Sequence, residues 1–303
     1  MKHSDFNMKT HGFVGHMAEP DSETDKAVIV IMGGEKSILP GIKIAERFAD
    51  YGFIGLSVSL FGAEGLPDSP DRCPLEMFEN AVKYLRQTGK IPHISVYGMS
   101  MGSIFAALTA VYVGGIENVI LVSPAHVPFE GTTADKKHMT GHSAAVRQGE
   151  EIPFVSADFS KVKAMKYQKH PAASHKVTGM WVAYHDAYQD KICERAAFIP
   201  YEKTDARILL IAGGADEMWD AEYSVRAIQK YLESKKYSRD FKALVFPNVS
   251  HLTGMMPNRE REKRLFKMIP IIGLMYKSFG KHKAECMAAL ERSETEIVGW
   301  LNN

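Results

Sequence analysis

The sequence predicts an α/β fold in which helices cover both faces of a mostly parallel β-sheet. Short runs of apolar and β-branched residues alternate with longer stretches of helical periodicity along most of the chain. Most of the short runs are apolar at consecutive positions, which is typical of parallel strands buried on both faces. The 303 residues, 45% of them hydrophobic, are enough to bury a sizeable core.

The individual elements follow from these patterns. The predicted parallel strands are residues 27–32, 53–60, 94–97, 119–122, 208–212 and 243–246. The predicted helices are residues 41–51, 75–87, 103–113, 221–234 and 285–301. Ahead of them, residues 11–19 and the segment around Phe6 are expected to form an antiparallel pair at the sheet edge.

The alternation of strands and helices stops between Pro124 and Pro200, where aromatic residues and mixed charges take over. This stretch is too long for a simple connection, so we predict an insertion that caps the sheet and shapes the substrate pocket. The alternative is a helical embellishment with no part in binding. We expect a single α/β domain over residues 1–303, with the cap at about 125–200.

Composition and charge narrow the classes of function. A net charge of +1 gives no overall field that would recruit nucleic acid. Three scattered cysteines and an N-terminus without a secretory signal predict a reducing, cytoplasmic location. The uncharged stretch 94–116 is interrupted by glycines and Ser100, which favours a strand and a buried helix over a membrane span. Neither a cofactor nor a metal is expected, and the oligomeric state is left open.

The pentapeptide Gly98-Met99-Ser100-Met101-Gly102 lies where a predicted strand meets a predicted helix. Glycines at both ends permit a sharp turn that exposes the Ser100 hydroxyl and directs the first N–H groups of the helix toward the group it attacks. This setting predicts that Ser100 is a nucleophile.

A serine nucleophile needs a base, and the base needs an acid that holds it in the right tautomer. Asp216 follows the strand at 208–212 and is the predicted acid; the alternative role, a helix N-cap, suits Asp220 better. His251 follows the last strand and is the predicted base, because the order in this fold is Ser, acid, His. Competing histidines in the insertion precede the acid in sequence; they are His142, His170, His175 and His185.

An oxyanion formed during attack needs backbone N–H donors. The N–H of Met101 is one predicted donor, and Gly34, with Glu35 next to it, is predicted to supply the second. Alternatively, Gly33 and Gly34 only make a tight turn. Together these features predict a serine hydrolase of the α/β-hydrolase fold that acts on a small-molecule ester or thioester through an acyl-enzyme.

Motifs outside this constellation resemble the C-terminal catalytic domain of acyl-CoA thioesterases and bile acid-CoA:amino acid N-acyltransferases. The likeness covers nearly the whole chain from about Gly12. Its motifs are residues 51–53, 75–85, 98–102, 149–153, 198–202, 216–219 and 247–251, and the tail from Lys281. The resemblance implies that Ser100, Asp216 and His251 are nucleophile, acid and base, and that the substrate is an acyl-CoA.

The chain departs from this family in two ways. The family proteins carry an N-terminal β-sandwich domain, for which the residues before Ala27 are too few, and they have a basic residue where this chain has Met101. Because the amino acid-conjugating members use cysteine as nucleophile, Ser100 favours transfer of the acyl group to water. A carboxylesterase, a dienelactone hydrolase-like enzyme and a peptidase remain alternatives on the same triad, and an inactive binding module is a further one.

Two other features bear on the substrate. Basic residues of the insertion could contact the phosphates of CoA; they are Lys136, Lys137, Arg147, Lys161, Lys163 and Lys166. The apolar run 268–276 is expected to close over an acyl pocket or to pack into the core, and the alternative is that it dips into a membrane surface.

Overall fold

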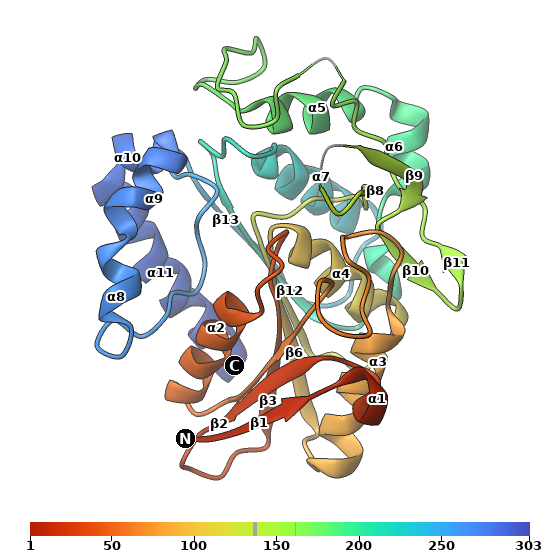
Figure 1. Cartoon of the computed structure of the whole chain (residues 1–303), viewed down its shortest axis with the longest axis vertical. Helices are drawn as coiled ribbons and strands as arrows, with labels where there is room; N and C mark the ends of the chain where they lie inside the picture. Colours follow the sequence, from red (N-terminus) through yellow and green to blue (C-terminus); the bar gives the residue numbers. More distant parts are fainter. Residues whose placement is uncertain (136–137, 161) are drawn as a thin grey trace.

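The computed structural model describes residues 1–135, 138–160 and 162–303, and its centre is an eight-stranded sheet (Figure 1). The strand order is β1-β2-β4-β3-β6-β7-β12-β13. The strands are β1 (Lys2–Phe6), β2 (Gly15–Glu19), β3 (Lys26–Ile31), β4 (Ile54–Val58), β6 (His93–Met99), β7 (Asn118–Val122), β12 (Arg207–Gly213) and β13 (Phe241–Phe246). Within this sheet, the pairs β1–β2 and β2–β4 are antiparallel and the other neighbouring pairs are parallel. The order and direction are those of the α/β-hydrolase fold, as predicted.

Helices cover both faces of this sheet because its strands are apolar at successive positions. On β3, Val28 and Val30 face one cluster of buried side chains, whereas Ile29 and Ile31 face another. The first cluster includes side chains of α2 (Leu39–Asp50) and α11 (Lys283–Asn302). The second includes side chains of α3 (Glu76–Lys83), α4 (Met101–Tyr112) and α7 (Ala221–Ser234).

Two predicted elements differ from the structure. The predicted helix 75–87 is α-helical only to Lys83; a π-helical turn follows over Tyr84–Thr88, because the Gly89 N–H donates to the carbonyl of Tyr84, five residues back. The predicted strand 11–19 begins only at Gly15. His11 instead ends the short helix α1 (Met8–His11), which the Asn7 side chain caps and which Gly12 terminates in a left-handed conformation.

In its described residues, the segment between Pro124 and Pro200 combines short strands with two helices. These are β8 (Glu130–Thr132), β9 (Met139–Ser143), β10 (Ala145–Arg147), β11 (Glu150–Glu151), α5 (Gly179–Ala187) and α6 (Lys191–Ala197). The strand β10 pairs with β5 (Cys73–Pro74), which ties the segment to the loop before α3. Thr178, which precedes α5, donates through its backbone N–H and its hydroxyl to the carbonyl of Glu217, just after β12.

Three short helices lie between β13 and α11, at the left of Figure 1: α8 (Lys263–Lys267), α9 (Ile269–Met275) and α10 (Lys277–Lys281). Ile269 and Phe279 anchor them in a small core with Val249, Cys286 and Leu290. Among the described residues, no helix is long and apolar enough to cross a bilayer, and the stretch 94–116 contains most of β6 and the whole of the helix α4.

Candidate active site

The turn at Ser100 is a tight strand-to-helix elbow between β6 and α4. Ser100 adopts φ 57° and ψ −128°, a conformation that residues with a Cβ rarely adopt. Its N–H donates to the carbonyl of Val122 at 2.9 Å, and the Ser103 N–H donates to its carbonyl at 2.9 Å. A Cβ on Gly98 would overlap the carbonyl of Gly102, so the elbow requires glycine there.

His251 lies in the loop after β13 and faces this serine. Its Nε2 is 2.9 Å from Ser100 Oγ, and its side chain is buried. The Ser123 hydroxyl donates to the carbonyl of His251 at 2.7 Å, which fixes the backbone of the loop. Among the described residues, His251 is therefore the histidine within hydrogen-bond distance of the Ser100 hydroxyl. The four competing histidines of the insertion are not within this distance.

Asp216 reaches His251 from the loop after β12. Its Oδ2 is 2.7 Å from His251 Nδ1, and Oδ1 accepts from the backbone N–H groups of Met218 and Trp219 at 2.8 and 3.3 Å. With Asp216 ionised, Nδ1 carries the proton, so that Nε2 can accept a proton from Ser100. Asp220 instead caps α7 by accepting from the N–H of Tyr223 at 3.1 Å, as predicted.

The electrostatic environment favours a positive charge on His251. Burial by itself would lower the pKa of His251, but the negative charge of Asp216, with smaller contributions from Glu217 and Glu35, raises it above its ordinary value. The imidazolium that forms when the imidazole accepts a proton is stabilised in the same way. This arrangement has the geometry and the charge of a general base next to a nucleophile.

Two residues that adjoin or include the predicted oxyanion donors, Met101 and Gly33, lie next to Ser100. Met101 is the first residue of α4, next to Ser100. A Cβ on Gly33 would come within 3.0 Å of Ser100 Cβ and 3.3 Å of its Oγ, whereas a Cβ on Gly34 would meet nothing within 4 Å. The Gly33–Gly34 turn thus approaches the serine closely, and the assignment of the Gly34 and Glu35 N–H groups as donors stays a prediction.

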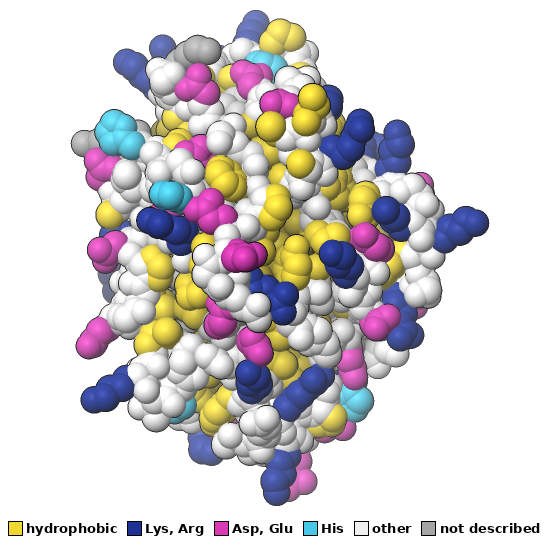
Figure 2. Space-filling model, turned by 90° about the vertical axis from the view of Figure 1, so that its right-hand side faces the viewer, with side chains coloured by type: hydrophobic (Ala, Val, Ile, Leu, Met, Phe, Trp, Pro, Cys, Tyr) yellow, Lys and Arg dark blue, Asp and Glu magenta, His cyan; other side chains and the backbone are white. Residues whose placement is uncertain are grey.

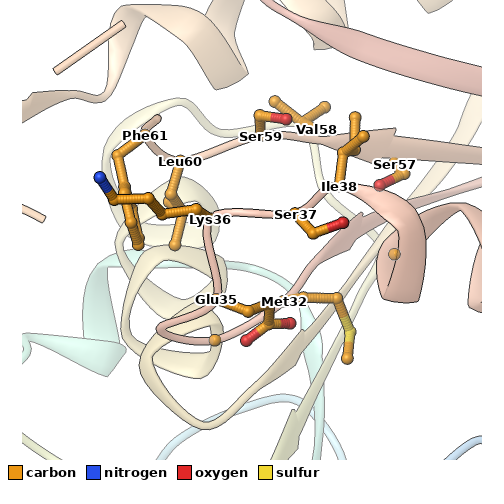
Figure 3. Close-up of a pocket in the computed structure, with 12 residues that line it drawn as sticks. Met32, Glu35, Lys36, Ser37, Ile38, Ser57, Val58, Ser59, Leu60 and Phe61 are labelled. Carbon is orange, nitrogen blue, oxygen red and sulfur yellow. The ribbon is translucent and has the colours of Figure 1, made fainter. Parts of the chain in front are cut away.

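A pocket opens beside this turn, between the loop after β3 and the end of β4 (Figure 3). Gly33 and Glu35 contribute to its lining on one side, and Ser57 and Ser59 on another. Lys36, Leu60 and Phe61 lie side by side at one end of the pocket in Figure 3. Gly33, which approaches Ser100 closely, is the lining residue that connects this pocket with the candidate nucleophile.

Sequence reasoning missed three residues around the base. The buried carboxylate of Glu217 accepts from the His251 N–H at 3.4 Å. The ring of Trp219 meets the imidazole edge-on at 5.6 Å, and the ring of Tyr276 lies parallel to it at 6.3 Å. Glu217 and Trp219 belong to the motif 216–219, so the resemblance to the family could have pointed to them. Tyr276 belongs to the apolar run 268–276.

The insertion approaches the acid through His175, whose Nε2 donates to the backbone carbonyl of Asp216 at 2.9 Å. A cavity of about 150 Å³ separates residues 172–175 from Trp219 and Asp220. Of the basic residues considered for CoA, Lys163 and Lys166 are exposed, and Arg147 lies over the ring of Tyr112. The other three, Lys136, Lys137 and Lys161, lie outside the described residues.

Comparison with known proteins identifies the family. The sequence model described as "BAAT / Acyl-CoA thioester hydrolase C terminal" matches residues 73–259, which include all three side chains of the Ser100–His251–Asp216 constellation. The chain belongs to this family. Within the described part of the chain, no group of three or more His, Cys, Asp or Glu side chains is placed to hold a metal ion.

Curated members of the family are distant in sequence. Acyl-coenzyme A thioesterase 1 of Rattus norvegicus is 24% identical over 209 residues, which are 68% of this chain and 44% of that protein. Acyl-coenzyme A thioesterase 2, mitochondrial, of Mus musculus is 27% identical over 192 residues, 63% of this chain and 37% of that protein. The match thus spans less than half the length of either relative, and the mitochondrial name leaves a cytoplasmic location as a prediction.

The chain is also similar to several solved structures. One is a thermostable carboxyl esterase from Bacillus coagulans, with a TM-score of 0.49 and 14% sequence identity. The aligned region covers 81% of this chain and 90% of the esterase chain.

Proposed function

We propose that the chain is a serine hydrolase that cleaves acyl-CoA thioesters through an acyl-enzyme. The main support is that three side chains are connected by hydrogen-bond distances. Ser100 Oγ lies 2.9 Å from His251 Nε2, and His251 Nδ1 lies 2.7 Å from Asp216 Oδ2. Membership of the acyl-CoA thioester hydrolase family supports a thioester as the substrate.

In the first half-reaction, Ser100 Oγ attacks the thioester carbonyl carbon while His251 Nε2 accepts the hydroxyl proton. Asp216 stabilises the resulting imidazolium. We propose that the N–H groups of Met101 and of the Gly34–Glu35 turn donate to the oxyanion. When the tetrahedral intermediate collapses, the C–S bond breaks and His251 returns the proton to the departing CoA thiolate.

In the second half-reaction, water attacks the Ser100 ester. His251 accepts a proton from this water, and the proton passes to Ser100 Oγ as the carboxylic acid leaves. Ser100 supports water over an amine as the acceptor, because the amino acid-conjugating proteins that the sequence resembles use cysteine as nucleophile.

We further propose that residues 125–200 form a cap on a single α/β-hydrolase domain. The hydrogen bonds of Thr178 and His175 to the loop that carries Asp216 support this role, because they join the insertion to the catalytic loop.

Fluorophosphonate labelling tests the nucleophile. We expect an adduct on Ser100 in the folded protein, none after heat denaturation, and none in Ser100→Ala. The exposed serine of α7 provides the matched control, and Ser234→Ala is expected to keep full labelling. Folded protein that carries no adduct on Ser100 would leave only the binding-module alternative.

Thiol release tests the substrate. Acyl-CoAs of several chain lengths are compared with aryl esters and peptides, and the thioesters are expected to turn over fastest. Ser100→Ala should lower turnover by at least about a thousandfold with the fold retained. Rapid ester cleavage with inert thioesters would favour a carboxylesterase or dienelactone hydrolase-like enzyme instead.

A further inference from the structure

We propose that the surface formed by α8, α9 and α10, residues 263–283, docks on an anionic lipid surface. The sequence suggested that the apolar run 268–276 would close a pocket or enter the core. The structure places one residue of α9, Ile269, in the core and leaves most of the run on the outside. The expectation of core packing is therefore wrong for the outer face of this helix.

The outer face of α9 is unusually apolar for an exposed surface. Leu274 is 78% exposed, Met275 56%, Ile271 52% and Met268 44%. Met268, Ile271 and Leu274 follow one another at intervals of three residues, and Met275 lies four residues after Ile271, which places them on one side of the helix. Together with Leu265 they make up five of the nine large hydrophobic side chains exposed among the described residues. Such clustering marks an interaction site rather than ordinary surface variation.

The segment that carries this apolar face is basic. Residues 263–283 contain no Asp or Glu, and their Lys and Arg residues are all exposed; these are Lys263, Arg264, Lys267, Lys277, Lys281 and Lys283. The face of the molecule in Figure 2, opposite α9 in Figure 1, intersperses cationic with anionic side chains instead. Apolar side chains framed by cations are the composition that inserts shallowly among anionic headgroups.

The surface is held in place by contacts on its inner side. The backbone N–H of Ser278 donates to Glu217 at 3.0 Å, and the Tyr167 hydroxyl donates to the carbonyl of Met275 at 2.9 Å. Phe279 is buried with Leu290 of α11. These contacts hold the exposed face in one conformation in the free protein, so binding to lipid does not require the segment to become ordered.

Charge favours a lipid surface over a second copy of this chain. A two-fold symmetric dimer through this surface would bring the same cations together from both copies, whereas anionic headgroups neutralise them. Tyr276, which stacks on His251, belongs to the same segment, so docking would bring the candidate active site close to the lipid. The inference goes beyond the proposed function, because lipid binding does not require Ser100.

Sedimentation with vesicles tests the proposal. The full chain is mixed with vesicles of phosphatidylcholine, alone or with about a third phosphatidylserine, at low and at high salt. We expect binding to the anionic vesicles that weakens as salt is raised, and about tenfold less binding to neutral ones. Ser100→Ala should bind as the wild type does, which separates this test from that of the hydrolase.

Paired variants locate the surface. Ile271→Ser with Leu274→Ser, both on the exposed face, should reduce binding at least about tenfold without unfolding the protein. The control is Ile192→Ser, since Ile192 is 84% exposed on α6. The double variant Lys267→Gln, Lys281→Gln should bind anionic vesicles about tenfold less than the wild type does. Its control is the double variant Lys230→Gln, Lys236→Gln, which changes two exposed lysines outside the segment and should bind as the wild type does.

Three results would overturn the proposal. One is absence of binding to anionic vesicles, and another is equal loss of binding in the Ile192→Ser control. The third is a concentration-dependent dimer that the Ile271→Ser, Leu274→Ser variant disperses, since it would assign this face to a second copy of the chain.

Discussion

The backbone N–H of Ser278 donates a 3.0 Å hydrogen bond to the carboxylate of Glu217, the neighbour of the candidate acid. The same carboxylate accepts from the His251 N–H at 3.4 Å. Burial, and then the charge of Asp216, raise the pKa of Glu217 above its usual range. The buried Glu217 carboxyl thus connects the loop that carries His251 with the α8–α10 segment. We infer that Glu217 is a positioning residue for His251.

Glu217→Gln should shift the pH dependence of hydrolysis. The Glu217 charge contributes to the raised pKa of His251, so its removal lowers that pKa. Because the reaction needs neutral His251, the acid limb of the kcat/KM profile should move to lower pH. The plateau should fall several-fold, since the two N–H groups bind different carboxylate oxygens and glutamine keeps only one of those oxygens. The matched control is Glu233→Gln, on the exposed side of α7. If the acid limbs of the two variants lay at the same pH, Glu217 would have no effect on the pKa of His251.

Asp216→Asn should abolish most activity while the fold is retained. Without the carboxylate, His251 loses the strongest influence that raises its pKa and the partner that holds its ring in the required tautomer. We expect a loss of about 10³–10⁴-fold in kcat. Steady-state thiol release measures it, with Asp220→Asn as the control that keeps the cap of α7. Comparable turnover in the two variants would remove Asp216 from the proposed triad.

Gly102→Ala should destabilise the elbow. A Cβ at Gly102 would overlap the carbonyl oxygens of Ile31 and Met32, so α4 would have to move away from β3. We expect the free energy of unfolding to fall by about 1–3 kcal/mol in urea denaturation. Gly299 of α11 has open space around it, and Gly299→Ala should raise stability by about 0.5–1 kcal/mol. A neutral effect at Gly102 would contradict the close approach.

Glu194→Gln should weaken the pH dependence of stability. Burial by itself would raise the pKa of Glu194, but hydrogen bonds from His126, Lys191 and Tyr223 lower it to about 2. A lowered carboxyl pKa stabilises the fold above the unfolded-state value of about 4.5, and this stabilisation is lost as the pH falls toward about 2.

Urea titrations of wild type and Glu194→Gln at neutral pH and near pH 3 measure this difference. The variant should be less stable at neutral pH by about 1–3 kcal/mol and should lose less stability on acidification. Glu233→Gln should follow the wild type. Parallel curves for the wild type and Glu194→Gln would show that the network around His126 contributes no pH-dependent stability.

Local sequence predicted much of this fold because its signals act over short distances. The runs at 27–32 and 208–212 are apolar throughout, and parallel strands buried on both faces require that pattern. The glycines around Ser100 predicted a strand-to-helix turn, since only a residue without a Cβ fits where the two elements meet. The order of Ser100, Asp216 and His251 along the chain likewise followed from the strands that precede them.

Tertiary structure alone decided how distant segments meet. Glu217 and Ser278 are 61 positions apart, and nothing in either local pattern indicates that one accepts a hydrogen bond from the other. The run 268–276 has the composition of a core segment, yet Leu274 is exposed because Ile269 and Phe279 are the side chains that reach the core. Composition determines which side chains tend to leave water, but the packing of loops against one another determines which of them can.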